Sequence, residues 1–360
     1  MTEAILLAGG KGSRLRPVTL RTPKPMVPAA GVPFLAHQLA RARAAGVTHV
    51  VLATSYLAEV FEPYFGDGSA LGMRLTYVTE DRPLGTGGAV RGAADALESG
   101  PADPVLVLNG DILTGLDLAG LVRGHLRAGA AVTLHLTRVD DPREYGLVPT
   151  DGTGRVLRFT EKPQRPEEIV TDQINAGCYV FRREVIDTVP AGRPVSVERE
   201  TFPGLLASGA LLHGVVDRSY WRDLGRPACF VQASADLVRG VVASPALPGP
   251  TGEYLLMPGA RIEEGAVLGG GTVVGAGARI GAGAVVEGSV VLDGARVDEG
   301  ARVHASMLGA GSYVGRGTTV TGAVVGDGAR VGAANELDHG ARVWCDARIP
   351  DAAIRFSPDC

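Results

Sequence analysis

The chain has 360 residues, of which 45% are hydrophobic and 21% are charged, and its formal net charge is −4. This composition is typical of a globular protein with room for two domains, and it argues against a disordered chain. The weak negative charge argues against a general nucleic-acid or anionic-membrane binder. The early apolar run at residues 4–8 is too short for a signal peptide or a membrane helix. We therefore expect a cytoplasmic protein with no nucleic-acid or membrane partner.

The cysteines are few and scattered. Cys178, Cys229, Cys345 and Cys360 lie far apart in the chain, so they lack the close spacing of metal ligands or redox pairs. We expect all of them to be reduced thiols, which agrees with a cytoplasmic location.

The first part of the chain alternates strand-like and helix-like segments. Short apolar runs predict buried strands at residues 4–8, 49–53 and 104–108, and residues 34–45 are helix-like. This alternation predicts an α/β domain with a mostly parallel sheet, whose sites lie at the carboxyl ends of the strands. We place this domain at residues 1–240. A linker rich in Ala and Pro follows at residues 241–252.

The last hundred residues follow a different period. Aliphatic residues recur at every sixth position from Ile262 to Leu292, and the step shortens to five at Val297 and again at Leu308. A period of six fits neither a helix nor a plain β-strand, and it is typical of a left-handed parallel β-helix. Sixteen such positions predict about five coils within residues 253–360, with the five-residue steps as tightened corners.

The strongest local signal is a glycine-rich stretch directly after the first predicted strand. It reads LAGGKGSRLRP at residues 7–17, and PKP follows at residues 23–25. Glycines let backbone N–H groups approach an anion closely, and Lys11, Arg14 and Lys24 can neutralise a polyphosphate. Only three of the 35 basic residues are lysines, and two of them fall here. We therefore predict a phosphate-binding loop rather than a plain turn.

These motifs resemble the signature of the sugar-1-phosphate nucleotidyltransferases. The resemblance covers nearly the whole chain, and the order of its segments is most similar to the branch of the family that makes GDP-mannose. The further matching segments are EDRPLGTGGAV (80–90), LNGDIL (108–113), EYGLV (144–148), FTEKP (159–163), INAGCYVF (174–181), SVERETFP (196–203) and YWRDLGRP (220–227). The resemblance implies a Rossmann-like catalytic domain followed by a left-handed β-helix.

The family reaction implies a particular division of roles. A phosphate oxygen of the sugar 1-phosphate attacks the α-phosphorus of a nucleoside triphosphate, and pyrophosphate leaves. The attacking oxygen is already anionic near pH 7 because the second pKa of a phosphate monoester is about 6. No general base is needed, so catalysis rests on positioning and charge neutralisation.

The charged residues of the motifs match family positions with those roles. Arg14 matches the arginine of the β- and γ-phosphates, Lys24 the lysine near the α-phosphate, and Lys162 the residue that holds the sugar phosphate. Asp111 and Asp223 match two carboxylates that bind Mg²⁺, an ion that takes few protein ligands.

The resemblance also implies a nucleotide site around the glycine loop. Its members are Leu7, Ala8, Gly9, Gly10, Gly12, Ser13, Glu80, Pro83, Gly85, Thr86, Asn109 and Gly110. Glu80 matches a glutamine that reads the pyrimidine in thymidylyl-transferring relatives. A carboxylate can accept from both N1–H and N2–H₂ of guanine, whereas it would face the carbonyl oxygens of uracil or thymine. We therefore favour GTP; the alternative is a solvated surface glutamate.

The sugar site implied by the family comprises Tyr145, Gly146, Glu161, Asn175 and Gly177. The carboxylate of Glu161 can accept hydrogen bonds from sugar hydroxyls, and the amide of Asn175 can donate or accept them. The two glycines admit close backbone contact. The glutamate and the asparagine are the expected direct contacts.

Several alternatives remain open from the sequence. The same reaction can use another pair, such as glucose 1-phosphate with UTP, dTTP or ATP, or GTP with a mannose-like cyclitol phosphate. A non-catalytic nucleotide-sugar-binding regulatory subunit is disfavoured because the glycine loop and its cations are present. Acyl transfer by the β-helix is disfavoured because His304 and His339 lie in turn-like positions. Stacked coils present flat side faces, so we expect a homo-oligomer, either a dimer or a tetramer.

Overall fold

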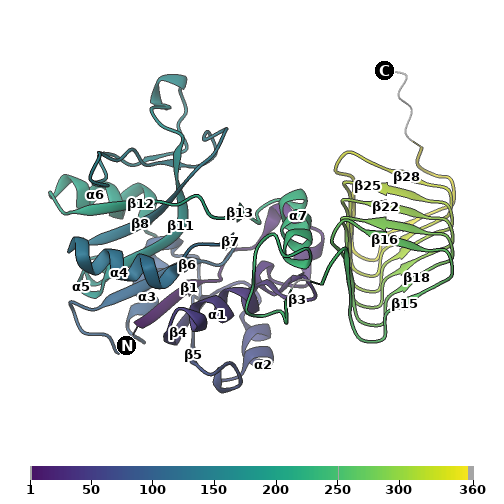
Figure 1. Cartoon of the computed structure of the whole chain (residues 1–360), viewed down its shortest axis with the longest axis horizontal. Coiled ribbons are helices and arrows are strands. Elements are labelled where there is room, and N and C mark those ends of the chain that lie inside the picture. Colours follow the sequence, from purple (N-terminus) through teal and green to yellow (C-terminus); the bar gives the residue numbers. More distant parts are fainter. Residues whose placement is uncertain (1, 250, 356–360) are drawn as a thin grey trace. The chain divides into compact units, whose positions relative to one another are not determined.

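The computed structural model describes residues 2–249 and 251–355, so Cys360 lies outside the described part. The chain forms two compact units, and neither is continuous in sequence (Figure 1). The first combines Met1–Gly10 with Gln38–Trp221, and the second combines Lys11–His37 with Arg222–Cys360. Within the described ranges, no helix has the length and apolar character needed to cross a membrane.

The first unit is built on a mostly parallel sheet. The strands β1, β4, β5 and β6 run parallel, in the order β6-β1-β4-β5. The antiparallel strand β11 extends this sheet beyond β6 and also pairs with β8, which in turn pairs with β12. The strands are β1 (Thr2–Leu7), β4 (Val47–Thr54), β5 (Arg74–Thr79), β6 (Pro104–Asn109), β8 (Val132–Arg138), β9 (Gly146–Leu147), β10 (Thr160–Glu161), β11 (Gln173–Arg182) and β12 (Leu212–Val216). The predicted α/β class is confirmed.

Short strands and helices complete the part of the chain up to Val238. The short strands are β2 (Pro28–Ala29), β3 (Val32–Pro33), β7 (Ile112–Thr114) and β13 (Trp221–Asp223). The helices are α1 (Phe34–Ala44), α2 (Phe61–Phe65), α3 (Gly85–Ala94), α4 (Leu118–Ala128), α5 (Arg183–Asp187), α6 (Phe202–Ala207) and α7 (Pro227–Val238). Local sequence sets their ends. Asp117 caps α4 by accepting from the Gly120 N–H at 2.9 Å, and α7 starts at Pro227, where a missing N–H costs nothing.

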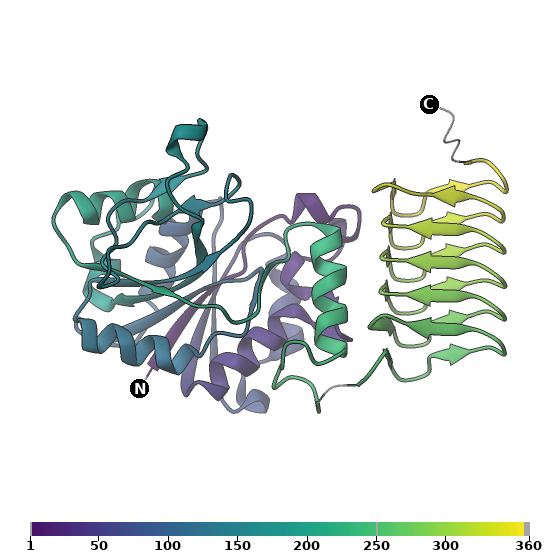
Figure 2. The ribbon, with the colours of Figure 1, turned by 45° about the horizontal axis from the view of Figure 1, so that its top comes forward.

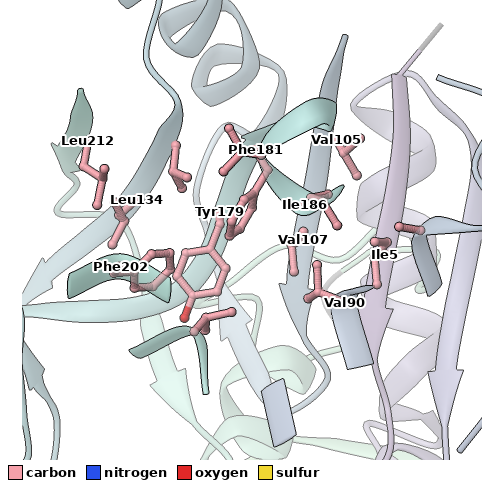
Figure 3. Close-up of a cluster of buried hydrophobic side chains, with 14 of the residues drawn as sticks. Ile5, Val90, Val105, Val107, Leu134, Tyr179, Phe181, Ile186, Phe202 and Leu212 are labelled. Atoms are coloured by element: carbon pink, nitrogen blue, oxygen red, sulfur yellow. The ribbon is translucent and has the colours of Figure 1, made fainter. Parts of the chain in front are cut away.

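An aromatic cluster fills the core between β11 and the helices beside it. Tyr179, Phe181 and Phe202 are fully buried, and the rings of Tyr179 and Phe202 lie 5.2 Å apart (Figure 3). Burying one such side chain stabilises the fold by roughly 1.5–3 kcal/mol. The cluster therefore anchors β11, whose first residues include Asn175 and Gly177 of the predicted sugar site.

The C-terminal part is the predicted left-handed parallel β-helix, and Figure 2 shows its coils stacked in regular layers. Its strands lie in three parallel sheets of six, six and five strands, so the described residues form slightly more than the five coils predicted. The strands are β14 (Tyr254–Leu256), β15 (Arg261–Ile262), β16 (Val267–Gly269), β17 (Thr272–Val274), β18 (Arg279–Ile280), β19 (Val285–Glu287), β20 (Val290–Val291), β21 (Arg296–Val297), β22 (Arg302–His304), β23 (Met307–Leu308), β24 (Tyr313–Val314), β25 (Thr319–Thr321), β26 (Val324–Val325), β27 (Arg330–Val331), β28 (Glu336–Leu337), β29 (Arg342–Val343) and β30 (Arg348–Ile349).

The register corrects one position of the sequence pattern. Val291, not Leu292, points into the β-helix core after Val286, so the first five-residue step comes one strand earlier than predicted. Each five-residue step shortens one coil, because Val273 pairs with Val290 at a spacing of 17 residues. The prediction chose Leu292 because Val291 and Leu292 are both apolar, and adjacent residues of a strand point to opposite faces, so only one of them can face inward.

The tight corners carry a ladder of buried hydroxyl groups. The N–H of Ser289 donates to Thr272 Oγ1 at 3.3 Å, and the N–H of Ser306 donates to Ser289 Oγ at 3.1 Å. The N–H of Ala323 then donates to Ser306 Oγ at 3.1 Å. Small polar side chains therefore satisfy backbone groups that a shortened corner leaves inside the coil.

Contacts to the β-helix hold the segment Lys11–His37 within the second unit. Arg21 forms an ion pair with Asp346, and Arg342 Nη1 donates to the Arg16 carbonyl oxygen at 2.8 Å. The segment that carries two of the three predicted catalytic cations is therefore supported by the last coils.

Candidate active site

The glycine loop and the loop after β6 meet at the carboxyl end of the parallel sheet. Leu7 and Asn109 are register partners in β1 and β6, and the Gly110 N–H donates to the Leu7 carbonyl oxygen at 2.9 Å. Ser55, after β4, donates to the Gly9 carbonyl oxygen. The structure thus brings together two groups of predicted nucleotide residues, those at the end of β1 (7–10) and those at the end of β6 (109–110). Asp111 lies half-buried directly after them.

Gly12 brings the glycine loop against Lys24. Its φ of 56° lies in the left-handed region, and a side chain there would place its Cβ 2.9 Å from Lys24 Cβ. Thr19 Oγ1 fastens the turn by donating to the Gly12 carbonyl oxygen at 2.8 Å. Lys24 is only 7% exposed, so its ammonium is directed by its surroundings, whereas Lys11, Ser13 and Arg14 are exposed.

Arg14 and Asp223 lie over the same glycine in the second unit. A Cβ at Gly225 would meet Arg14 Nη2 at 2.4 Å and Asp223 Oδ1 at 2.9 Å. The Gly225 N–H donates to Asp223 Oδ1 at 2.7 Å, which orients that carboxylate. The structure therefore places a predicted phosphate cation beside a predicted metal carboxylate.

Glu80 has a buried carboxylate oxygen that no group in the described part of the chain satisfies. Its Oε2 accepts a long hydrogen bond, 3.4 Å, from the Leu84 N–H. Among the described residues, none donates a hydrogen bond to its buried Oε1. Burial raises the pKa of Glu80, and the Leu84 N–H opposes this rise. This oxygen lies at the start of the segment with the predicted nucleotide residues Pro83, Gly85 and Thr86.

Thr86 faces the segment before α6 rather than open solvent. Its Oγ1 donates to Glu198 Oε2 at 2.8 Å and accepts from the Val197 N–H at 3.0 Å. Glu198 lies on the short π-helix η7 (Val197–Thr201), a kind of irregularity that is frequent at functional sites. The sequence analysis did not select Glu198. The segment SVERETFP, which contains Glu198, does match the family, but that match assigned no role to the glutamate.

Glu161 covers Gly146 in the predicted sugar site. Strands β9 and β10 pair these two residues directly. A Cβ at Gly146 would lie 2.8 Å from Glu161 Oε2 and equally close to the Phe159 ring, so only glycine leaves room for this carboxylate. Burial raises the pKa of Glu161, the charge of Glu198 adds to the rise, and Lys162 opposes it.

The amide of Asn175 is engaged within the protein. Its Nδ2 donates to the Tyr179 hydroxyl at 2.7 Å, and its Oδ1 accepts from the Gly177 N–H at 3.2 Å. These bonds shape an irregularity in the pairing of β11 with β8, where a bulge can re-aim side chains. Oδ1 retains a second lone pair, so its contact with sugar stays a prediction.

Two aromatic residues frame the same region. The rings of Tyr145 and Trp221 meet edge to face at 5.7 Å, and Trp221 Nε1 donates to the Ala176 carbonyl oxygen at 3.0 Å. The N–H of Lys162 donates to the Tyr145 carbonyl oxygen at 3.1 Å. Lys162 itself has a φ of 49° and an exposed side chain. The unusual backbone conformation directs this lysine away from the strand that precedes it.

The predicted site residues divide between the two units. Gly12, Ser13, Arg14, Lys24 and Asp223 belong to the second unit, and the others belong to the first. Within the ranges that the structure describes, no three residues of the types His, Cys, Asp and Glu form a metal-binding group. The predicted metal ligands Asp111 and Asp223 each offer hard oxygen donors, the ligand type that Mg²⁺ prefers.

A glycine-rich turn at the carboxyl end of a parallel sheet is typical of α/β proteins that bind nucleotides. Residues 3–240 match the family described as nucleotidyl transferase, and residues 250–347 match the family described as the GMPPB C-terminal domain. The chain therefore belongs to the nucleotidyl transferase family.

Curated relatives match over long stretches. A protein of Mycobacterium tuberculosis named mannose-1-phosphate guanylyltransferase is 54% identical over 358 residues, covering 99% of this chain and 98% of the relative. A protein of Drosophila melanogaster named mannose-1-phosphate guanylyltransferase catalytic subunit beta is 37% identical over 270 residues, covering 73% of this chain and 72% of the relative.

Solved structures match 65% of the chain. HddC from Yersinia pseudotuberculosis, complexed with GMP-PN, has a TM-score of 0.55 and 28% identity, covering 65% of this chain and 98% of that one. A glucose-1-phosphate thymidylyltransferase from Bacillus anthracis, itself named as putative, is 24% identical with a TM-score of 0.58, covering 65% of this chain and 94% of that one. The second match concerns the fold alone.

Proposed function

We propose that the protein transfers a guanylyl group from GTP to mannose 1-phosphate or a close analogue, giving a GDP-sugar and pyrophosphate. The near full-length relative of Mycobacterium tuberculosis supports this activity by its name. A cytoplasmic location and a homo-oligomer assembled through the β-helix, residues 253–360, belong to the same proposal.

The unsatisfied oxygen of Glu80 is the observation that supports guanine as the base. A buried acceptor without a donor costs about 1–3 kcal/mol, and more when it is charged. Guanine offers two adjacent donors, N1–H and N2–H₂, to such a carboxylate. Adenine, uracil and thymine lack that pair of donors. A base other than guanine would therefore leave Glu80 Oε1 without a donor and would incur this same cost.

Phosphate chemistry rests on the charges of the glycine loop. Arg14 neutralises the β- and γ-phosphates, Lys24 the α-phosphate, and the loop N–H groups orient them. Asp111 and Asp223 are the residues proposed to hold Mg²⁺. When bound, that ion supplies charge neutralisation for the triphosphate. Since the attacking phosphate oxygen is already ionised, these residues act by alignment and by stabilising charge on the leaving pyrophosphate.

The sugar 1-phosphate is held by residues of the first unit. Lys162 binds the phosphate of the sugar 1-phosphate, and Glu161 accepts hydrogen bonds from sugar hydroxyls. The short distance from Gly146 to the Glu161 carboxylate supports a pocket built for close contact with a small polyhydroxylated ligand.

A substrate grid tests this function. Pyrophosphate release is measured with GTP, ATP, UTP and dTTP against the 1-phosphates of mannose and glucose, with Mg²⁺. Release with GTP and mannose 1-phosphate is expected. Release with a different pair would contradict the substrates and keep the mechanism. If no pair releases pyrophosphate although GTP still binds, the protein is not a catalyst, and the result favours a regulatory subunit.

The role of Glu80 is tested with a matched variant. Glu80→Gln is expected to lower kcat/KM for GTP about 10-fold or more and to raise the use of pyrimidine triphosphates, because the amide loses one acceptor. The control is Asp81→Asn at the neighbouring exposed carboxylate, which should change neither. Unchanged base selectivity in Glu80→Gln would contradict base reading by this residue.

A further inference from the structure

A main-chain contact joins residues 84–88, the nucleotide loop, to residues 193–198, which we call the strap. The Val195 N–H donates to the Leu84 carbonyl oxygen at 2.8 Å, and the Gly87 N–H donates back to the Val195 carbonyl oxygen at 2.8 Å. The strap therefore occupies two N–H groups in the first turn of α3, that of Gly87 at 2.8 Å and that of Gly88 at 3.3 Å. Those groups serve this contact rather than a phosphate.

The Glu198 side chain completes the contact. Its Oε2 accepts from Thr86 Oγ1 at 2.8 Å and from Ser196 Oγ at 2.6 Å. Thr86 Oγ1 also accepts from the Val197 N–H. Hydrogen bonds to an ionised acceptor are about twice as strong as neutral ones. The rotamer of Thr86, in the middle of the nucleotide loop, is thus held by this carboxylate together with the Val197 N–H.

The helix that carries Glu198 also lies beside the predicted sugar site. The helix η7 packs against both α3 and β10, the strand that carries Glu161. The charge of Glu198 raises the pKa of Glu161 and that of the buried Tyr179, although burial is the larger cause in each case. Both hydroxyl donors to Glu198 reach its Oε2, so its second oxygen, Oε1, can accept from a ligand. Hydroxyl donors from a ligand would relieve the repulsion between the two carboxylates.

We propose that Glu198 is a positioning residue that couples the sugar site to the nucleotide loop. Hydroxyls of the bound sugar fix Glu161 and Glu198, and Glu198 fixes Thr86 through its other oxygen. Each substrate then raises the affinity of the protein for the other, by the same factor in both directions. This inference rests on the proposed function, because it takes a sugar 1-phosphate and GTP as the two ligands.

Calorimetry on the full chain measures the coupling. Mannose 1-phosphate is titrated with and without saturating guanosine 5′-(α,β-methylene)triphosphate, an analogue that cannot release pyrophosphate, in the presence of Mg²⁺. We expect the analogue to tighten sugar phosphate binding about 5-fold or more in the unaltered protein. Thr86→Val, which removes the hydroxyl and keeps the shape, should bring this factor to within about 2-fold of unity while binding of mannose 1-phosphate alone is preserved.

Two further variants define the source of the effect. Glu198→Ala should lose the coupling and also weaken mannose 1-phosphate alone, and the double variant should show no further loss of coupling. The control is Glu200→Ala, also on η7. Its carboxylate pairs with the exposed Arg193 and accepts from the Ser196 N–H at 3.3 Å, and this variant should keep the full factor. Coupling that survives in Thr86→Val and Glu198→Ala, or that is absent from an active unaltered protein, overturns the proposal.

Failure of the proposed function is recognised separately. Pyrophosphate release by the unaltered protein is measured first on the same preparation. If the substrate grid identifies another pair, the function as stated fails, and the coupling is measured with that pair. If Glu198→Ala does not fold, Thr86→Val alone decides the inference.

Discussion

The β-helix and the parallel sheet reach a buried core by different routes. In the β-helix each strand pairs with the next coil, as Val273 does with Val290. In the sheet, Glu3 pairs with His49 and with Val105, far along the chain. The β-helix repeats one contact between neighbouring coils. The sheet depends on contacts between strands that are far apart in the sequence, and no local pattern predicts them. Stability should therefore be distributed over the coils, and function concentrated where distant loops meet.

The largest expected contrast is between two arginines. Arg14→Ala should lower kcat by about 10²-fold or more, because it removes charge that stabilises the leaving pyrophosphate. Arg316→Ala, which breaks an exposed ion pair with Glu299 on the β-helix, should leave turnover unchanged. Steady-state pyrophosphate release measures both. Retained activity in Arg14→Ala would remove its assigned role.

The sugar site provides the next largest effect. Gly146→Val should raise the KM for mannose 1-phosphate about 10-fold or more, because its side chain would displace the Glu161 carboxylate and press on Phe159. The KM for GTP should change much less. Gly124→Ala on α4 is the control, since a Cβ at this half-buried position meets no described atom within 4 Å. Equal changes in both KM values would argue for general disruption instead.

Acid should separate the two regions by stability. Burial lowers the pKa of His135 to about 4, and it does the same for His125. Unfolded histidine titrates near 6.5, so between pH 6.5 and 4 the unfolded chain binds more protons and the first unit loses stability as the pH falls. Thermal unfolding followed from pH 7 to pH 4 should show this loss. His135→Leu should flatten it, and an unchanged slope would assign the acid sensitivity to other groups.

The smallest effect concerns one corner of the β-helix. Ser306→Ala removes a hydroxyl that donates to the His304 carbonyl oxygen at 2.7 Å and accepts from the Ala323 N–H. Alanine already occupies the equivalent corner at Ala323, so its size is tolerated there. We expect a loss of about 1–3 kcal/mol in unfolding free energy, with kcat unchanged. Denaturant unfolding measures the loss of stability, and pyrophosphate release on the same sample measures kcat. A lower kcat would contradict the prediction.

Sequence predicted the parts of the fold that rest on local pattern. The six-residue period gave the β-helix because every coil repeats the same inward position, and it failed at Leu292 because Val291 beside it is equally apolar. The apolar runs gave the parallel strands, and their carboxyl ends explain why Leu7 and Asn109 meet. The assignment of roles within the site came from the family resemblance rather than from spacing.

The link between Thr86 and Glu198 could not be predicted. The two residues are distant in sequence, and a charged stretch such as 198–200 is indistinguishable from a solvated surface until the chain is folded. The same holds for Asn175, whose bonds to Tyr179 and Gly177 depend on an irregular strand pairing. Side-chain partners across loops are a property of the assembled structure.

The hydroxyl ladder of the β-helix also has a direction. At each tight corner a hydroxyl of one coil accepts the N–H of the coil that follows it in sequence, from Thr272 to Ser289 to Ser306. A coil already built thus presents the acceptor for the next one. During synthesis the chain leaves the ribosome in this same order. The β-helix can therefore lengthen from a completed end as new residues emerge, without waiting for the rest of the protein.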